Sequence, residues 1–98
     1  MRNDKRFNEA LEKIKMVFSR MNFKGKAFLF GSSVRDDYLK TSDIDIAVDC
    51  SEKRFVTFLR LEIEELDIPY KVELIDFTEA SAALKEEIVT HGVLIWKN

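Results

Sequence analysis

The fold is decided by residues 43–49, which read DIDIAVD. Apolar side chains stand at every second position, and aspartates occupy most of the others. A period of two is typical of a strand with one buried face, because successive side chains point to opposite faces of a sheet. The segment therefore predicts a strand that is anchored in a core on one face and presents Asp43 and Asp45 together on the other.

Helical and strand-like patterns alternate on both sides of this segment. Upstream, apolar residues recur at helical spacing over residues 3–22, with Asn3 or Asp4 as the expected cap, and a short buried strand follows at 27–30. Downstream, we expect a helix capped by Ser51 and ending near residue 66, a strand at 70–77, a helix capped by Thr78 and ending near residue 90, and an edge strand at 93–96.

This order of elements predicts an α/β (α+β) fold, in which a small mixed sheet of about four strands is covered by helices. We expect residues 1–98 to form one domain. Apolar positions of the two later helices, among them Phe58 and Ala82, are expected in the core.

Composition excludes several classes of protein. Hydrophobic residues make up 46% and charged residues 35% of the chain, which is a globular rather than a disordered balance. The net charge is −2, and the basic residues form no stripe that would hold a nucleic acid, so no nucleic-acid partner is expected. A single cysteine, Cys50, allows no intrachain disulfide, and no apolar run reaches the length of about 18 residues that spans a membrane. We therefore expect a cytoplasmic protein without membrane contact.

The paired aspartates call for a counter-charge. Two carboxylates about 4 Å apart repel each other by about 4 kcal/mol at an effective dielectric constant of about 20. A Mg²⁺ ion relieves that repulsion, since it prefers carboxylate oxygens and keeps coordination positions for phosphates. On the pair alone, the alternative of a half-exposed strand whose acids face water stays open.

A glycine-serine turn lies upstream of the pair. Gly31 and Ser32 follow the buried strand at 27–30, and glycine lets a backbone approach a ligand closely. Free backbone N–H groups at such a turn suit a triphosphate, and Arg35 is placed to meet a phosphate oxygen.

Together these features resemble a known family. Ten residues separate Gly31 and Ser32 from Asp43 and Asp45, and the stretch 30–48 closely resembles the polymerase-beta-like nucleotidyltransferase superfamily, in particular its minimal nucleotidyltransferases (MNT). The resemblance implies that Gly31 and Ser32 hold the phosphates of a nucleoside triphosphate and that Asp43 and Asp45 bind metal.

The flanking positions of the motif carry two further implied roles and one departure. Arg35 and Ser42 match positions of the family signature and are implied as nucleotide-binding residues. The family usually has glycine where this chain has Asp36. A carboxylate there would either weaken phosphate binding or cap the turn harmlessly.

The family also places a third carboxylate on a following strand. Glu73 and Asp76 both lie in the predicted strand 70–77 and point to opposite faces, so only one of them joins the pair. Glu73 fits best by position and is favoured as the third metal ligand, with Asp76 as its rival.

The resemblance implies a Mg²⁺-dependent nucleotidyltransferase, with two Mg²⁺ ions held by Asp43, Asp45 and Glu73 and with ATP as the substrate. By the same resemblance, AMP would pass to a hydroxyl of a helical HEPN-type partner protein, and the chain would act as an antitoxin. The alternative is a catalytically weak or inactive binding module that neutralises its partner by contact, and Asp36 keeps that alternative open. A small-molecule acceptor is less favoured, because we find no second domain to hold one.

Overall fold

The computed structural model describes residues 4–34 and 43–98. Within these residues the elements follow in the order α1 (Lys5–Arg20), β1 (Lys26–Phe30), a 3-10 turn η1 (Gly31–Ser33), β2 (Ile44–Asp49), α2 (Lys53–Glu64), β3 (Val72–Asp76), a second 3-10 turn η2 (Phe77–Glu79), α3 (Ala82–His91) and β4 (Val93–Lys97). No helix among these elements is both long and apolar enough to cross a bilayer.

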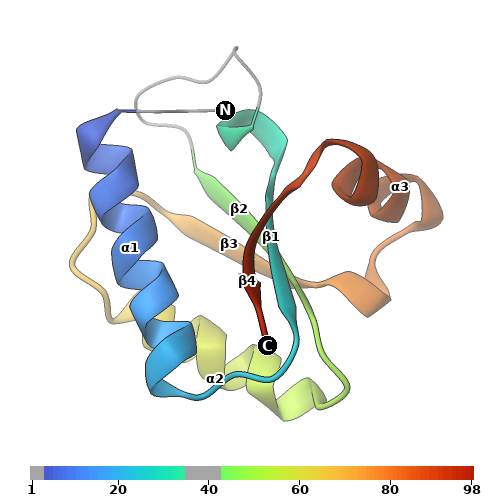
Figure 1. Cartoon of the computed structure of the whole chain (residues 1–98), viewed down its shortest axis with the longest axis horizontal. Helices are drawn as coiled ribbons and strands as arrows, with labels where there is room; N and C mark the ends of the chain where they lie inside the picture. Colours follow the sequence, from blue (N-terminus) through green and yellow to red (C-terminus); the bar gives the residue numbers. More distant parts are fainter. Residues whose placement is uncertain (1–3, 35–42) are drawn as a thin grey trace.

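The strands of this described part form one mixed sheet in the order β3-β2-β1-β4. β1 runs antiparallel to both β2 and β4, whereas β2 and β3 are parallel. Parallel strands need a crossover connection, and α2 supplies it between β2 and β3 (Figure 1). The predicted mixed α/β sheet of about four strands is therefore confirmed, and β4 lies at an edge as expected.

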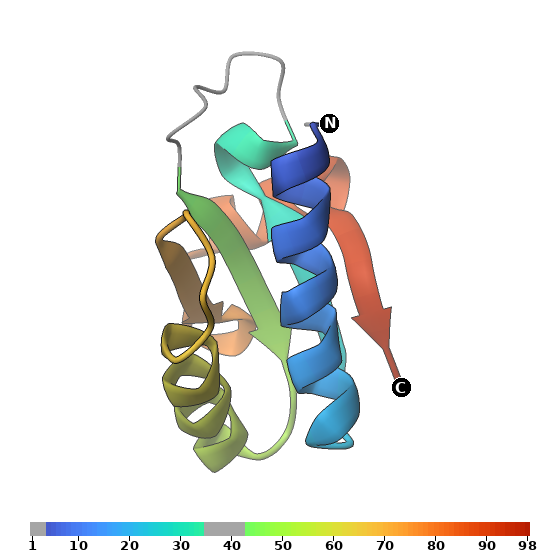
Figure 2. The same cartoon turned by 90° about the vertical axis from the view of Figure 1, so that its left-hand side faces the viewer.

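Helices cover the sheet unequally. α1 and α2 lie side by side over one face, while α3 lies on the other side of the sheet, next to β1 (Figures 1 and 2). The core fills the space beneath α1 and α2, where each fully buried large apolar side chain contributes roughly 1.5–3 kcal/mol. Its largest fully buried members are Phe7, Ile14, Val17, Phe18, Phe23, Leu29, Ile44, Ile46, Val48 and Leu59.

The face opposite α1 and α2 is covered only in part. Phe28 of β1 packs against Phe77 of η2 with ring centroids 6.0 Å apart, and Ala47 of β2 is fully buried. Asp43 and Asp45, toward the start of β2, are only half-buried. The cover of this face therefore stops short of the two aspartates, which keeps them accessible to a ligand.

Two of the helix starts test the predicted caps. Asp4 caps α1, since its Oδ1 accepts a hydrogen bond from the N–H of Phe7 at 2.8 Å, as expected. Ser51 was wrongly predicted to cap α2. The residue before α2 is Glu52, and its side chain makes no capping hydrogen bond.

The start of α3 also differs from the prediction. Thr78 does not cap this helix, because it lies in η2, where its hydroxyl donates to Oδ1 of Asp76 at 2.8 Å. Ser81 is the cap, and its Oγ accepts from the N–H of Leu84 at 3.2 Å. The helix therefore begins three residues later than a cap at Thr78 would set it.

Two expected core residues lie outside the core. Phe58 is half exposed, at 50%, because α2 turns the stripe made by Val56, Leu59 and Ile63 toward the sheet. Ala82 is exposed at the first turn of α3, whose one buried residue among those described is Ile88. Helical spacing alone left the burying face of each helix uncertain by about one position.

Candidate active site

β2 brings the two aspartates to one face of the sheet. Ile44 and Ile46 are fully buried beneath α1 and α2, so Asp43 and Asp45, which alternate with them, project from the opposite face. Asp45 lies near the start of β2, a central strand of the sheet, and is paired with Phe30 of β1 on one side. A pair held on a central strand has little freedom, as a ligand-binding pair requires.

Gly31 closes against Asp45. Its φ of +73° lies in the left-handed region that glycine adopts without strain. A Cβ atom at this position would come within 2.5 Å of Oδ2 of Asp45. Only glycine at position 31 therefore leaves room for the Asp45 carboxylate beside the backbone of the turn.

The remaining residues of the predicted phosphate-binding turn are only partly described. Ser32 lies in η1 and is half-buried, directly after Gly31, and the turn closes with a hydrogen bond of 3.1 Å from the N–H of Val34 to the carbonyl of Gly31. Arg35, Asp36 and Ser42 lie outside the described residues, and their predicted roles stay predictions.

Glu73 is the register neighbour of Asp45. β2 and β3 are parallel, and Asp45 lies opposite Glu73 in their register, so both side chains project from the same face. The Glu73 side chain is 50% exposed, and its Oε1 lies 3.5 Å from Nζ of Lys71. Such an exposed pair contributes little to stability, so Glu73 is not held in place by the fold.

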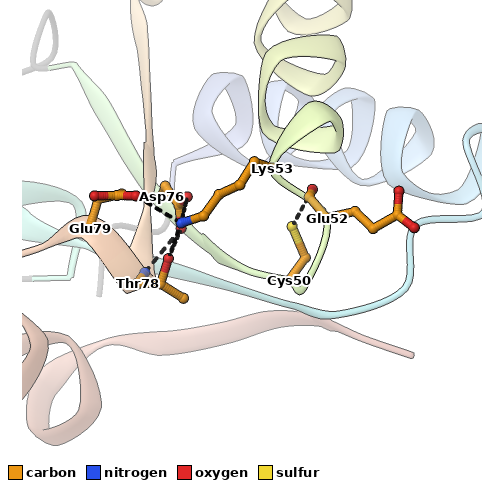
Figure 3. Close-up of polar contacts among 6 residues, drawn as sticks. All are labelled: Cys50, Glu52, Lys53, Asp76, Thr78 and Glu79. Carbon is orange, nitrogen blue, oxygen red and sulfur yellow. Dashed lines mark hydrogen bonds and ion pairs between the residues drawn. The ribbon is translucent and has the colours of Figure 1, made fainter.

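Asp76, the rival third carboxylate, belongs to a different cluster at the far end of β3. Lys53, the first residue of α2, donates hydrogen bonds from Nζ to Oδ2 of Asp76 at 2.8 Å, to Oγ1 of Thr78 at 2.5 Å and to Oε1 of Glu79 at 2.9 Å (Figure 3). Asp76 is opposite Val48 in the sheet register, on the face that carries the core. The structure therefore brings Glu73, and not Asp76, to the face of Asp43 and Asp45.

The Lys53 cluster ties α2 to the end of β3 electrostatically. Burial alone would raise the pKa of Asp76, but the hydrogen bonds from Lys53 and Thr78 outweigh it and hold the pKa of this carboxyl below its ordinary value. The same hydrogen bonds to Asp76 and Glu79 raise the pKa of Lys53. The Asp76 side chain is only 11% exposed, so we assign it a structural role.

Exchanging each acid for its amide separates these two roles. Asp76→Asn should lower the free energy of unfolding by about 1–2 kcal/mol, because a charge-assisted hydrogen bond is weakened, with a fall in Tm of roughly 4–16 °C. Glu73→Gln should leave Tm almost unchanged and reduce nucleotidyl transfer. Thermal unfolding and transfer assays on both variants test this, and a reversed pattern would make Asp76 the third carboxylate.

Acid should remove the contribution of Asp76. A carboxyl whose pKa is depressed in the folded state stabilises the fold above its unfolded pKa of about 3.9, and this stabilisation is lost as the pH falls through the folded pKa. The difference in Tm between wild type and Asp76→Asn should therefore be largest near neutral pH and shrink below about pH 4. A difference that stays constant from pH 7 to pH 3 would contradict this account of the cluster.

The acidic residues fit a metal ion that arrives with a ligand. Within residues 4–34 and 43–98, no three His, Cys, Asp or Glu side chains are grouped so that they could hold a metal by themselves. Mg²⁺, however, is commonly bound by one or two carboxylates, and water and substrate phosphates complete its shell. Asp43 and Asp45 supply that donor set on one accessible face, beside a turn whose backbone is open at Gly31.

The lone cysteine takes no part in this chemistry. Cys50 is buried, its Sγ donates to the carbonyl of Glu52 at 3.2 Å, and burial raises the pKa of its thiol above the ordinary value. A thiol with a raised pKa is a poor nucleophile at neutral pH. Cys50 therefore acts as a small buried residue.

A mixed sheet with two aspartates at the start of one strand, beside a glycine turn that follows the neighbouring strand, is typical of the nucleotidyltransferase class of domains. The model of the family described as "Polymerase beta, Nucleotidyltransferase" matches residues 12–98. The chain belongs to this family, and it is a nucleotidyltransferase domain.

Individual relatives agree with this assignment. A protein of Methanocaldococcus jannaschii that bears the name "Putative protein adenylyltransferase" is 33% identical over 89 residues, which are 88% of this chain and 94% of that protein. A crystal structure of a toxin-antitoxin with AMP-PNP matches with a TM-score of 0.66 and 30% identity over 89% of this chain and 73% of that one. A structure of a tri-AMPylated Shewanella oneidensis HEPN toxin in complex with its MNT antitoxin matches with a TM-score of 0.64 and 29% identity, over 93% of this chain and 72% of that one.

Proposed function

We propose that this domain transfers AMP from ATP to a hydroxyl group of a HEPN-type partner protein, in a reaction that depends on Mg²⁺. The observation that carries the proposal is the apposition of Gly31 and Asp45, which joins the turn expected to bind phosphates to the carboxylates expected to bind metal. Family membership supports the reaction class, and the relatives described above support the nucleotide and the kind of acceptor.

Asp43 and Asp45 would hold Mg²⁺, and Glu73 would complete the site for a second ion. When bound, Mg²⁺ neutralises the charge that develops on the phosphate oxygens and on the leaving pyrophosphate. Glu73 is well suited to join only when the ligands are present, because its ion pair with Lys71 is exposed and weak.

The protein positions the nucleotide for an in-line displacement. Gly31 and Ser32 would hold the phosphates through the backbone and the serine hydroxyl, with Arg35 and Ser42 as further nucleotide-binding residues. The acceptor oxygen forms a bond to the α-phosphorus, the bond from that phosphorus to the oxygen bridging to the β-phosphate breaks, and pyrophosphate leaves. The proton of the acceptor hydroxyl passes to solvent. Positioning and charge stabilisation account for most of the catalysis in transfers of this kind.

The biological role that follows is that of an antitoxin. Adding AMP to a hydroxyl places a bulky anion on the partner, and a single such modification changes local charge enough to block a binding surface or an active site. The structure of the AMPylated HEPN toxin with its MNT antitoxin supports this role for the present chain.

A second candidate function is neutralisation by contact alone. It is favoured by the absence, within the described residues, of a preformed group of three metal-binding side chains. A domain that used only its surface would need neither aspartate. The two candidates therefore differ in what they require of Asp43 and Asp45.

The experiment is co-expression of a growth-arresting HEPN-type protein from the same genome with either wild type or the Asp43→Asn, Asp45→Asn double variant. Transfer requires that the wild type restores growth and adds the mass of AMP to the partner, whereas the double variant does neither while still forming the complex. Restored growth with the unmodified partner, in both cases, would establish neutralisation by contact and overturn the proposed reaction.

A further inference from the structure

A cavity opens on the side of Gly31 toward α3. Its volume is about 420 Å³, within the range of roughly 300–1,000 Å³ that is usual for small-molecule sites. The described residues that line it are Phe30, Gly31, Val34, Glu87, His91 and Gly92. They come from the end of β1, the turn after it and the last turns of α3, which lie far apart in the sequence and meet at this place (Figure 1).

The lining of the cavity has an apolar side and a polar side. Phe30 and Val34 offer an aromatic and an aliphatic surface. Glu87 and His91 are four residues apart on α3, so both side chains lie on one face of that helix and reach the same cavity. Apolar walls with a few polar groups are typical of sites that bind a flat, partly polar ring.

The position and the charge of the cavity indicate which part of a ligand it would bind. Gly31 belongs both to the lining of the cavity and to the contact with Asp45, so the cavity adjoins the proposed phosphate and metal site. Glu87 disfavours phosphate groups in the cavity itself, because like charges repel. It accepts hydrogen bonds instead, and the hydroxyl groups of a ribose and the amino group of a base donate them.

We propose that this cavity holds the nucleoside part of the nucleoside triphosphate, and that Glu87 and His91 determine how strongly it is bound. The proposal rests on the function proposed above, since it takes the phosphates to lie at Gly31 and Ser32. Phe30 and Val34 pack against the base, while Glu87 and His91 hydrogen-bond to its edge or to the ribose. The end of α3 thereby becomes a specificity element of the domain.

Isothermal titration separates nucleoside contacts from phosphate contacts. Wild type, Glu87→Gln and His91→Ala are each titrated with ATP and with inorganic tripolyphosphate, in the presence of Mg²⁺. Both variants should bind ATP about tenfold more weakly, which is the usual effect of losing one hydrogen bond to a ligand, and should bind tripolyphosphate as the wild type does. Glu86→Gln is the matched control, since Glu86 is exposed on the same helix and does not belong to the described lining of this cavity.

The outcomes are distinct. Unchanged ATP affinity in both variants would overturn the inference. An equal loss of ATP and tripolyphosphate binding would also overturn it, because Glu87 and His91 would then not act through the nucleoside. If ATP binding in the wild type depends on Asp45, the proposed function stands whichever way the α3 variants behave. Circular dichroism and Tm of each variant establish that α3 remains folded, as expected for substitutions at two exposed positions.

Discussion

Asp45→Asn should reduce nucleotidyl transfer by at least about a thousandfold, equivalent to about 4 kcal/mol of transition-state stabilisation. The amide has the size of the carboxylate but neither its charge nor its affinity for Mg²⁺. Tm should stay the same or rise slightly, because the repulsion between Asp45 and Asp43 disappears. The measurement is transfer of labelled AMP to the partner protein, with thermal unfolding recorded on the same samples.

Asp49→Asn provides the control on the same strand. Asp49 alternates with the buried residues of β2 as Asp45 does, but it lies at the other end of the strand, opposite Lys26 of β1. This variant should transfer AMP at the rate of the wild type. Full activity in Asp45→Asn, or an equal loss in both variants, would contradict the assignment of the site to the start of β2.

Gly31→Ala should damage both the fold and the site. An alanine held at a φ of +73° costs about 1–2 kcal/mol in backbone strain, which lowers Tm by roughly 4–16 °C in a domain of this size. Its Cβ would also lie within 2.5 Å of Oδ2 of Asp45, so either the carboxylate or the turn must move. We therefore expect Mg²⁺-dependent ATP binding to fall at least about tenfold, since both groups take part in it.

Gly25→Ala separates strain from function. Gly25 also has a positive φ, at +151°, and a Cβ there would collide with the backbone carbonyl of Asp49. It precedes β1, whereas Gly31 follows that strand, so its damage lies away from Asp45. Gly25→Ala should lower Tm and leave ATP binding intact at temperatures where the variant is folded. Equal loss of ATP binding in both variants would mean that the effect of Gly31→Ala comes from instability alone.

The face that carries the aspartates could be predicted because it depends on local alternation. In residues 43–49 the apolar side chains all fall on one parity, and the structure buries Ile44, Ile46 and Val48 together. The cap at Asp4 follows from a local hydrogen bond in the same way. Both features arise within a few residues along the chain, although the same kind of local reasoning misplaced the caps at Ser51 and Thr78.

The choice between Glu73 and Asp76 required knowledge of the sheet. Parity placed Glu73 and Asp76 on opposite faces, but the register that sets Asp45 opposite Glu73 arises from the pairing of β2 with β3. The contact of Lys53 with Asp76 joins residues 23 positions apart, and no local sequence pattern predicts it. Local pattern also fails to show that Thr78 does not cap α3, because its hydroxyl is bonded to Lys53 and Asp76 in this cluster.

The cavity beside α3 was not foreseen either. The position of His91 near Gly31 depends on how α3 packs beside β1, and no local pattern in the sequence indicates that packing. The spacing of His91 from Glu87 is a signal that the sequence does contain, but that spacing gains a meaning only when the two side chains are seen to line one cavity.

The most direct test of the account is a thermal-shift titration of the isolated domain with ATP, GTP, CTP and UTP, each with and without Mg²⁺. Wild type and the Asp43→Asn, Asp45→Asn variant are compared side by side. A ligand that binds only the folded state raises Tm, so the account predicts an increase with ATP that requires Mg²⁺ and is absent from the variant. An increase of equal size in wild type and variant, or one that is independent of Mg²⁺, would contradict the claim that these two aspartates bind the metal and the nucleotide together.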